Sequence, residues 1–368
     1  MNSSTILGLD IGGANTKAAL IQFQDHEITK LYSYIEYFPF WEKTIEAIPQ
    51  MLQRIIIKLI IKNDYKLSEI DTIAIAMTAE LSDAFQTKKE GIITILEALN
   101  KVFDKDKLFF ISVNNEFIRF EKVKSEPYSV AAANWVSTAL FLGNFVSNCI
   151  LIDAGSTTID IIPILKSYPV TQGKDDISRL INHELIYTGG LRATIPSITH
   201  FVPFKGQLIR ISFEKFALIS DVHRILGNIS EEHYINDTAD NRSKSLQDCY
   251  SRLSRILCMD IETISKNELD KIAKFIYDKQ IDIIYNELNE FLKNLKERIP
   301  EFETNPLFVI TGLSADFLIK RTLEKMGYNN IKYFEKITII PDEISSSAFA
   351  VAGALFYQLR KDHSNEIK

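Results

Sequence analysis

The chain has little cysteine and little tryptophan among its 368 residues, and it has no long uninterrupted hydrophobic run. Its three cysteines, Cys149, Cys249 and Cys258, are too few and too irregularly spaced for a disulfide framework or a zinc knuckle. We therefore expect buried, inert thiols and a reducing compartment. The six histidines form no His-x-x-x-His pattern, which argues against a catalytic zinc ion.

Export, membrane insertion and nucleic-acid binding also lack support. The first residues show no basic segment followed by a long apolar one, so we expect no secretory signal and a cytoplasmic location. The most apolar run, residues 55–61, is interrupted by Lys58 and is far shorter than the roughly 20 residues that span a bilayer. Acidic side chains outnumber basic ones by 48 to 42, and the net charge of −6 argues against a nucleic-acid binder.

The chain does have the composition of an α/β protein and its alternation of strands and helices. Hydrophobic residues make up 46% of it and charged residues 24%, as in ordinary soluble globular proteins, and the length favours two domains. Strand-like and helix-like segments take turns along the chain rather than segregating. The predicted strands are residues 6–11, 16–23, 72–76, 108–113, 148–153 and 158–165, and the predicted helices are residues 41–62, 91–103, 128–142 and 271–298.

A short pattern of aspartate and glycine occurs once at the head of each half of the chain. In the first copy, Asp10-x-Gly12 is followed by a lysine five residues after the glycine. In the second copy, Asp153-x-Gly155 is followed at the same offset by Asp160. Each copy lies between an apolar strand and a returning strand, so we interpret the pair as two related domains that face one another. Coincidence is the alternative, and for Asp160 a structural role in the hairpin is the alternative to catalysis.

The chemistry of these turns points to a bound polyphosphate. Backbone N–H groups in a glycine-bearing turn form an anion-binding concavity, and two such turns across a cleft can clasp a diphosphate or triphosphate. Asp10 and Asp153 can hold Mg²⁺, the one cofactor we expect, directly or through its waters. Lys17 supplies a fixed cation for charge that develops on a departing phosphate, and glycines in the first turn are expected to supply positive φ. The residues that offer amides or hydroxyls around the two turns are Gly12, Gly13, Gly155, Ser156, Thr157 and Thr158.

The two turns resemble the phosphate loops of a known superfamily. LGLDIGGANTK and LIDAGSTTIDIIPI are similar to the two loops of the actin, sugar kinase and Hsp70 ATPase superfamily. FVITGLSADF resembles its adenosine-contacting strand, turn and helix, and SSSAFAVAGALFYQL resembles its closing connector helix. The resemblance implies an α/β fold of two actin-like (ribonuclease H-like) domains around a central cleft. The implied parts are residues 1–147, residues 148–342 with a helical insertion at about 212–300, and residues 343–368 as a helix that returns to the first domain.

Several further segments resemble the methanofuran biosynthesis synthase family, which is distantly related to the hydantoinase and oxoprolinase group. They are DIGGANTK, MTAELSDAF, AAANW, IDAGSTTIDIIPI, YTGGLRA, FEKFALISDVHRILGNI, ADNRSK and YSRLSRILCMD. The family implies a transferase that joins (aminomethyl)furanmethanol diphosphate to γ-glutamyltyramine through an aryl ether and releases pyrophosphate. A furfuryl diphosphate can ionise because the furan ring stabilises the cation, so such an enzyme chiefly binds and neutralises the leaving pyrophosphate.

The group that takes the phenolic proton is not fixed by the sequence. Glu80 follows the strand at 72–76, at the end of a parallel sheet that faces the cleft, and can take this proton or bind an ammonium group. The alternative is that Glu80 caps the next helix, and Asp83 is a weaker candidate base. Arg192 suits a bidentate grip on phosphate or carboxylate, although Pro196 lies further along the chain than in the family's usual pattern. The remaining residues predicted to bind substrate are Asn15, Thr16, Thr78, Gly189, Gly312 and Ser314.

The charged segment at residues 220–260 resembles an inserted helical subdomain. Most of it is expected to be solvated helical surface. Asp221 and Arg242 are its best candidates for a functional role, and His223 is expected to be structural. In the helix at 128–142, Asn134 is a candidate to approach the cleft, while the neighbouring tryptophan is expected in the core.

Two other functions stay open. An ATP-dependent small-molecule kinase of the same superfamily would hold a nucleotide at the Gly312 turn and activate a hydroxyl with Glu80 or Asp83. This turn has one glycine where sugar kinases often have two or three, which counts against adenosine binding. A non-enzymatic nucleotide switch or scaffold is the third function. The expected partners are the two small substrates, with no nucleic acid and no membrane, and a homo-oligomer is left open.

Overall fold

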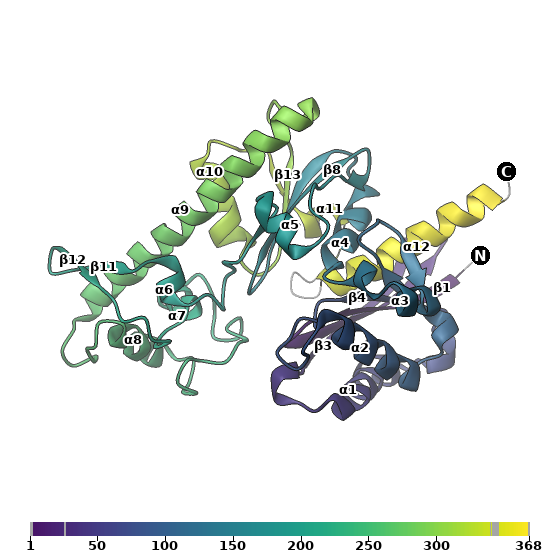
Figure 1. Cartoon of the computed structure of the whole chain (residues 1–368), viewed down its shortest axis with the longest axis horizontal. Coiled ribbons are helices and arrows are strands. Elements are labelled where there is room, and N and C mark those ends of the chain that lie inside the picture. The colour runs from purple at the N-terminus through teal and green to yellow at the C-terminus, as the bar shows by residue number, and fades with distance from the viewer. Residues whose placement is uncertain (1–2, 26, 339, 341–345, 367–368) are drawn as a thin grey trace. The chain divides into compact units, whose positions relative to one another are not determined.

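The computed structural model describes residues 3–25, 27–338, 340 and 346–366. Two compact units divide the chain. The first comprises Met1–Cys149, Ile162–Arg179 and Phe334–Lys368, and the second comprises Ile150–Ile161 and Leu180–Tyr333. Figure 1 shows their elements, coloured along the chain. The domain bounds predicted from the sequence stay a prediction. Residues 343–345, 367 and 368 of the predicted closing segment lie outside the described residues.

A six-stranded sheet forms the first unit, in the order β3-β2-β1-β4-β5-β6. Its strands are β1 (Ser3–Ile11), β2 (Asn15–Gln24), β3 (Glu27–Tyr37), β4 (Thr72–Met77), β5 (Leu108–Ile111) and β6 (Phe117–Arg119). The strands β1, β2 and β3 pair antiparallel, whereas β4 and β5 continue the sheet from β1 in parallel. Because successive side chains of a strand point to opposite faces, Asp10 faces away from Leu9 and Ile11.

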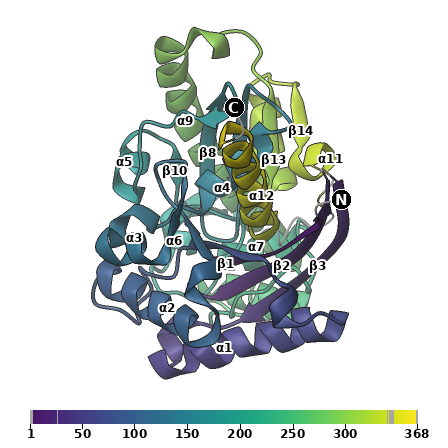
Figure 2. The same cartoon turned by 90° about the vertical axis from the view of Figure 1, so that its right-hand side faces the viewer.

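Helices cover both faces of this sheet. On one face, α1 (Ile48–Ile55) and α2 (Lys88–Val102) share a hydrophobic core with Leu9 and Ile11. On the other face, α12 (Ser346–Glu366) packs against β1, β2 and β4, as Figure 2 shows. The shorter helices that belong wholly to this unit are α3 (Phe120–Ser125), α4 (Asn134–Gly143) and α11 (Phe334–Thr338), and α5 (Asp176–Ile181) begins in it. Asp10 therefore lies on the face that α12 covers.

The second sheet repeats the strand order of the first. Its order is β10-β8-β7-β13-β14, with β9 paired beside β8. The strands are β7 (Cys149–Ala154), β8 (Ile159–Leu165), β9 (Tyr168–Pro169), β10 (Leu185–Ile186), β13 (Phe308–Thr311) and β14 (Ile331–Tyr333). With β6 and β9 set aside, each sheet has the order third, second, first, fourth, fifth strand along the chain, and an Asp-x-Gly turn follows the first strand of each. The predicted α/β class and its duplication are therefore confirmed.

A mostly helical insertion separates β10 from β13. Its elements are α6 (Ile195–Ile198), β11 (Phe201–Phe204), β12 (Gln207–Arg210), α7 (Ile219–Ile225), α8 (Leu246–Arg255) and α9 (Lys266–Arg298), and α10 (Arg321–Lys325) follows β13. The long helix α9 begins where the Ser265 hydroxyl accepts a hydrogen bond from the Glu268 N–H, which satisfies one of the free amides of the first turn. Apolar residues of α7, α8 and α9 form a core of their own. Among the described helices, none is long and apolar enough to cross a membrane.

The predicted helix at 41–62 was wrong in extent. Residues 40–47 form two 3₁₀ turns instead, and α1 begins at Ile48 with Pro49 in its first turn. Proline favours a helix start because it lacks an N–H and fixes φ, so it is disfavoured inside a longer helix. Beyond α1 the chain continues as a π-helical segment at Ile56–Ile60.

The predicted helix at 128–142 was also wrong, because it is broken. Pro127–Val130 forms a 3₁₀ turn, and Ala132, with φ of 47°, adopts a left-handed conformation that no helix continues through. The helix α4 begins only at Asn134, and Trp135 is buried in the core as expected. Alanine has the highest helix propensity, so the three alanines concealed this break in the sequence.

Two smaller expectations were wrong as well. Gly12 and Gly13 do not have positive φ; a side chain at Gly12 would instead place its Cβ 2.9 Å from the Asn15 carbonyl oxygen. Cys258 is exposed, whereas Cys149 and Cys249 are buried, and burial raises the pKa of both buried thiols to about 12. The expectation of inert thiols therefore fits only the two buried cysteines.

Candidate active site

The first Asp-x-Gly turn joins β1 to β2 in a tight hairpin. The Gly12 N–H donates to the Asn15 carbonyl at 3.1 Å and closes the turn. In the antiparallel ladder Asp10 pairs with Lys17, so both side chains lie on the face that α12 covers. The sequence therefore places a carboxylate and an ammonium side by side, immediately beside the glycine turn.

Close packing of α12 completes this arrangement. Gly8 lies under the start of α12, and a side chain there would place its Cβ 2.1 Å from the Ala348 carbonyl oxygen. This approach, which only glycine permits, brings the Ser347 hydroxyl to Asp10, where it donates to Oδ2 at 2.5 Å. Lys17 Nζ donates to the same hydroxyl at 3.4 Å. Ser347, which sequence reasoning did not assign, thus links the two charged side chains.

Two buried oxygens beside this turn have no hydrogen-bond partner among the described residues. They are Oδ1 of Asp10, a residue 6% exposed, and Oγ1 of Thr16, which is fully buried. A buried carboxylate oxygen left without a partner costs free energy unless a ligand satisfies it. Mg²⁺ is a hard cation that takes one or two carboxylate oxygens and completes its shell with water and phosphate, so Asp10 fits it. The described residues hold no group of three or more His, Cys, Asp or Glu side chains that would form an all-protein metal cage.

The loop after β4 lies against the same turn. The Thr78 N–H donates to the Ile11 carbonyl at 2.9 Å, and its hydroxyl lies 3.6 Å from where a Cβ of Gly12 would be. Glu80, two residues further on, is 1% exposed. It does not cap α2, because Thr87 accepts the hydrogen bond from the first turn of that helix. The alternative that Glu80 caps the next helix is therefore wrong.

Burial raises the pKa of the Glu80 carboxyl to about 7. The backbone amides of Glu80 and Ala132 and the charge of Lys88 lower it, and the charge of Asp176 raises it, but none of these offsets the loss of water. The Oε2 atom has no hydrogen-bond partner in the described part of the chain. Such a carboxyl can accept a proton near neutral pH, which suits a general base. Asp83, by contrast, is exposed.

The second Asp-x-Gly turn belongs to a cluster of three loops in the second unit. The Gly189 N–H donates to the Thr157 carbonyl at 2.9 Å, and the Gly190 N–H to the Gly155 carbonyl at 3.0 Å. The Leu191 and Arg192 amides both donate to the Ser156 carbonyl, at 3.0 and 3.1 Å. The YTGGLRA segment therefore lies along the turn through backbone bonds. The predicted residues from these two segments are brought together.

The third loop follows β13 and contains Gly312 and Ser314. Gly312 has φ of +92°, and a Cβ there would lie 2.5 Å from the Ala154 carbonyl oxygen and 2.7 Å from Oδ1 of Asp153. Ser314 is fully buried, and its hydroxyl donates to the carbonyls of Ala154 and Gly155 at 2.9 and 3.2 Å. This serine therefore holds the turn. The hydroxyls of the turn itself, at Ser156, Thr157 and Thr158, belong to half-buried residues.

The other predicted residues have simpler surroundings. Arg192 is exposed, and Asp160 lies opposite Leu185 in the β8–β10 ladder. Asn134 and Asn15 are partly buried. The substrate-binding role predicted for Arg192 stays a prediction.

Asp221 is part of a buried ion pair. Arg252 Nη2 lies 2.8 Å from Asp221 Oδ1, both side chains are fully buried, and the Tyr234 hydroxyl donates to the same oxygen at 2.9 Å. Arg252 also binds Asp240. Asp221 therefore stabilises the helical insertion, whereas Arg242 is exposed. His223 is fully buried, and the structural role expected for it stays a prediction.

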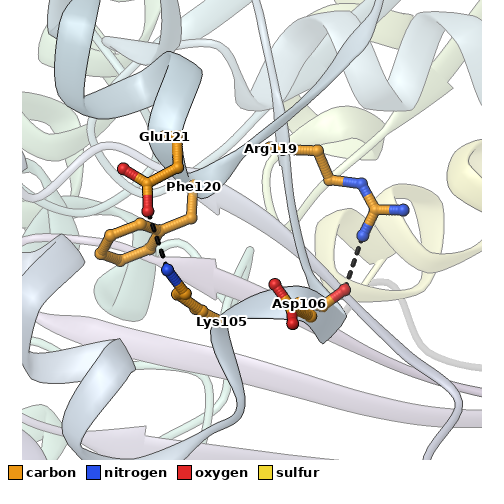
Figure 3. A pocket seen from close by; sticks show the side chains of 5 residues that line it. All are labelled: Lys105, Asp106, Arg119, Phe120 and Glu121. Atoms are coloured by element: carbon orange, nitrogen blue, oxygen red, sulfur yellow. Dashed lines mark hydrogen bonds and ion pairs between the residues drawn. The ribbon is translucent and has the colours of Figure 1, made fainter.

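A surface hollow of about 300 Å³ lies elsewhere in the first unit, lined by Lys105, Asp106, Arg119, Phe120 and Glu121 (Figure 3). Two of its charged side chains form an ion pair, and a third binds a backbone carbonyl. Lys105 Nζ lies 3.0 Å from Glu121 Oε1, and Arg119 donates to the Asp106 carbonyl at 2.6 Å. None of the predicted site residues lines it, so we assign it no part in catalysis.

Comparison with known proteins identifies the family. The hydantoinase/oxoprolinase family model matches residues 71–359. A protein of Methanocaldococcus jannaschii, named (4-{4-[2-(gamma-L-glutamylamino)ethyl]phenoxymethyl}furan-2-yl)methanamine synthase, is 36% identical over 359 residues, which cover 97% of this chain and 99% of that protein. The chain belongs to this synthase family. A protein of the same name from Methanococcus vannielii is 35% identical over 187 residues, covering 51% of this chain and 80% of that protein.

Membership in the synthase family confirms the resemblance seen in the sequence and makes the chain an enzyme. Among solved structures, nucleotide-free acetone carboxylase matches 95% of this chain and 70% of its own with a TM-score of 0.51 and 11% identity. A likeness at this level concerns the fold alone. Together with the duplicated sheet order, the chain has the two-domain actin-like α/β fold predicted from its sequence.

Proposed function

We propose that this chain joins (aminomethyl)furanmethanol diphosphate to γ-glutamyltyramine through an aryl ether and releases pyrophosphate, in methanofuran biosynthesis. The observation that carries the proposal is the 36% identity, over nearly the full length of both chains, with a protein named as the synthase of this ether. The site geometry supports the same chemistry. The names of both curated relatives favour a synthase, and no observation favours the kinase alternative.

The reaction breaks the bond between the furfuryl carbon and a diphosphate oxygen and forms the bond between that carbon and the phenol oxygen. Lys17 would bind the pyrophosphate oxygens as their charge develops, helped by the amides of the first turn. In the second unit, the amides and hydroxyls at residues 156–158 form a turn of the same kind, which is suited to bind a phosphate group. These groups interact more strongly with free pyrophosphate than with its ester, which lowers the barrier to bond breaking.

The unsatisfied Oδ1 of Asp10 would hold Mg²⁺, and Asp153 is the corresponding carboxylate of the second turn. When bound, Mg²⁺ supplies positive charge to the diphosphate oxygens. The Ser347 hydroxyl donates to Oδ2 of Asp10, so Oδ1 is the oxygen that would bind the cation. Lys17 is held near Asp10 through the same hydroxyl, ready to bind the anion.

Glu80 would take the phenolic proton as the ether bond forms. Its raised pKa of about 7 makes it a stronger base than an exposed carboxylate, yet leaves a large ionised fraction at neutral pH. Its low exposure keeps the carboxyl itself away from bulk water.

The test is a reaction with purified full-length protein, Mg²⁺, the furan diphosphate and γ-glutamyltyramine, without ATP. We expect pyrophosphate and the ether in equal amounts, detected by phosphorus NMR and mass spectrometry. A parallel reaction without γ-glutamyltyramine controls for simple hydrolysis. Formation of ADP from added ATP with no ether product would refute the proposal and support a kinase.

A further inference from the structure

A buried polar chain runs through the second unit from the helical insertion to the second turn. It begins at Gln280 of α9, whose side chain is fully buried. Gln280 Nε2 donates to Thr188 Oγ1 at 3.0 Å and to the Gly189 carbonyl at 3.1 Å, with the Thr188 carbonyl at 3.4 Å. We call the segment Thr188–Gly190 the TGG turn. One side-chain amide of the insertion thus binds the first two residues of this turn.

His223 fixes the orientation of this amide. Its Nε2 lies 3.0 Å from Gln280 Oε1, and an amide oxygen can only accept, so Nε2 carries the proton. The other ring nitrogen then accepts from Asn228 Nδ2 at 3.0 Å. Burial lowers the pKa of His223 to about 3, so the ring is neutral in this role. A reversed Gln280 amide would direct its oxygen at the Thr188 and Gly189 carbonyls.

Two aromatic rings lie against the ring of His223. The His223 ring lies 4.6 Å from the ring of Phe317 and 5.8 Å from that of Tyr277, measured between centroids. The Tyr277 hydroxyl in turn donates to the Phe317 carbonyl at 2.6 Å. Phe317 also contacts the TGG turn, since a Cβ at Gly190 would lie 3.3 Å from its Cζ. The ring of His223 therefore has little freedom to rotate.

Gly189, which Gln280 binds, contacts the second Asp-x-Gly turn. The Gly189 N–H donates to the Thr157 carbonyl, and a Cβ at Gly189 would lie 2.6 Å from the carbonyl carbon of Ser156. A shift of Gly189 would therefore move the backbone amides that a phosphate group would meet. Backbone amides stabilise an anion most when their positions are fixed before the anion binds.

We propose that Gln280 and His223 are positioning residues: they hold the TGG turn, and through it the anion-binding turn at residues 155–158. This inference rests on the proposed function, because it assigns that turn to the diphosphate of the substrate. Neither residue touches the substrate. They act on the affinity for pyrophosphate and on the KM for the furan diphosphate, and not on the KM for γ-glutamyltyramine.

The test compares variants of the full-length protein. Gln280→Met keeps the volume and removes every hydrogen bond of the amide. His223→Leu removes the donor to Gln280, whereas His223→Gln keeps an N–H donor at about the place of Nε2. Ile276→Ala is the control, because Ile276 is a fully buried residue of α9 that belongs to the apolar core of the insertion. Thermal unfolding identifies variants of matched stability.

Two readouts are taken on each variant: the affinity for inorganic pyrophosphate with Mg²⁺, by calorimetry, and amide hydrogen exchange in residues 155–158 and 188–192. We expect Gln280→Met and His223→Leu to bind pyrophosphate about tenfold more weakly or worse, as the loss of buried hydrogen bonds implies. Exchange in both segments should rise. His223→Gln should retain most of the affinity, and Ile276→Ala should leave affinity and local exchange near those of the wild type.

The outcomes separate the two claims. Amide exchange in Gln280→Met equal to that of the wild type would overturn the positioning role. So would a loss of pyrophosphate affinity in Ile276→Ala as large as the loss in Gln280→Met. So would faster exchange with normal affinity for pyrophosphate. If exchange rises in Gln280→Met while the wild type neither binds pyrophosphate nor forms the ether, the amide still positions the turn and the proposed function fails.

Discussion

Asp10 and Lys17 lie opposite each other in the β1–β2 ladder, and a single hydroxyl, that of Ser347, is hydrogen-bonded to both side chains. The carboxylate and the ammonium are thus held on one face without forming a direct ion pair in the described contacts. This leaves one carboxylate oxygen for a cation and the ammonium for an anion.

Lys17→Ala should slow ether formation strongly. Removal of a charged donor at a developing anion commonly costs about 3 kcal/mol, so we expect kcat to fall roughly a hundredfold or more. The measurement is steady-state release of pyrophosphate. The half-buried Lys17 contributes little to the core, so the unfolding midpoint should change little. A variant with near-normal kcat would remove Lys17 from the mechanism.

Ser347→Ala should weaken the site without unfolding it. The substitution removes a hydrogen bond to a carboxylate, worth about 1.5–3 kcal/mol, and we expect kcat/KM to fall by roughly tenfold or more. Ser137→Ala is a matched control, because Ser137 is also buried and donates only to the Asn134 carbonyl of its own helix. Equal activities of the two variants would show that the link between Asp10 and Lys17 does not serve catalysis.

Glu80→Gln should remove one limb of the pH–rate profile. As a base, Glu80 must be ionised, so the wild-type rate should fall as the pH drops below the carboxyl pKa of about 7. The glutamine variant should be slow and should lack this acidic limb. An unchanged limb in Glu80→Gln would assign the titration to another group.

The same variant has an expected effect on stability. Because the pKa of Glu80 is raised on folding from 4.5 to about 7, its contribution is fully present below pH 4.5 and is lost as the pH rises through 7. The pKa difference corresponds to roughly 3 kcal/mol. Denaturant unfolding should therefore show that the wild type loses stability relative to Glu80→Gln as the pH rises from about 5 to about 8. A constant difference would contradict the raised pKa.

Gly312→Ala should cost more stability than Gly327→Ala. Both glycines have positive φ, which strains alanine by roughly 1–2 kcal/mol, but Gly327 has open space around it. At Gly312 the new methyl would also overlap the Ala154 carbonyl and Asp153, and such overpacking adds about 1–3 kcal/mol. Urea unfolding of the two variants measures the difference. Equal losses of stability in the two variants would show that the turn after β7 shifts to accommodate the methyl group at little cost.

The sequence was informative where hydrophobic strands alternate with turns. The strands β4 and β7 were predicted to within one residue at each end, because continuous apolar stretches bounded by turn residues are typical of buried strands. The strand β1 was predicted as well, but it begins at Ser3 rather than at Ile6. The break before α4 was missed, since it depends on a left-handed Ala132 that propensity does not reveal. The edge strand β3 was missed as well, because it is mostly exposed and carries no strong apolar pattern.

For the site, the sequence predicted the residues that lie next to a turn in the chain. It missed Ser347, which reaches Asp10 only because Gly8 lets α12 approach β1. It also missed Gln280, whose partners lie about ninety residues earlier in the chain. Such long-range hydrogen bonds leave no local pattern in a single sequence. The only available signal for Ser347 was the run of serines before an apolar helix.

The contact between Ser347 and Asp10 spans 337 residues. Ribosomes deliver the amino end first, so the opening hairpin emerges long before the helix that supplies its hydroxyl. A nascent chain therefore carries Asp10 and Lys17 without the hydroxyl that links them until residue 347 has emerged.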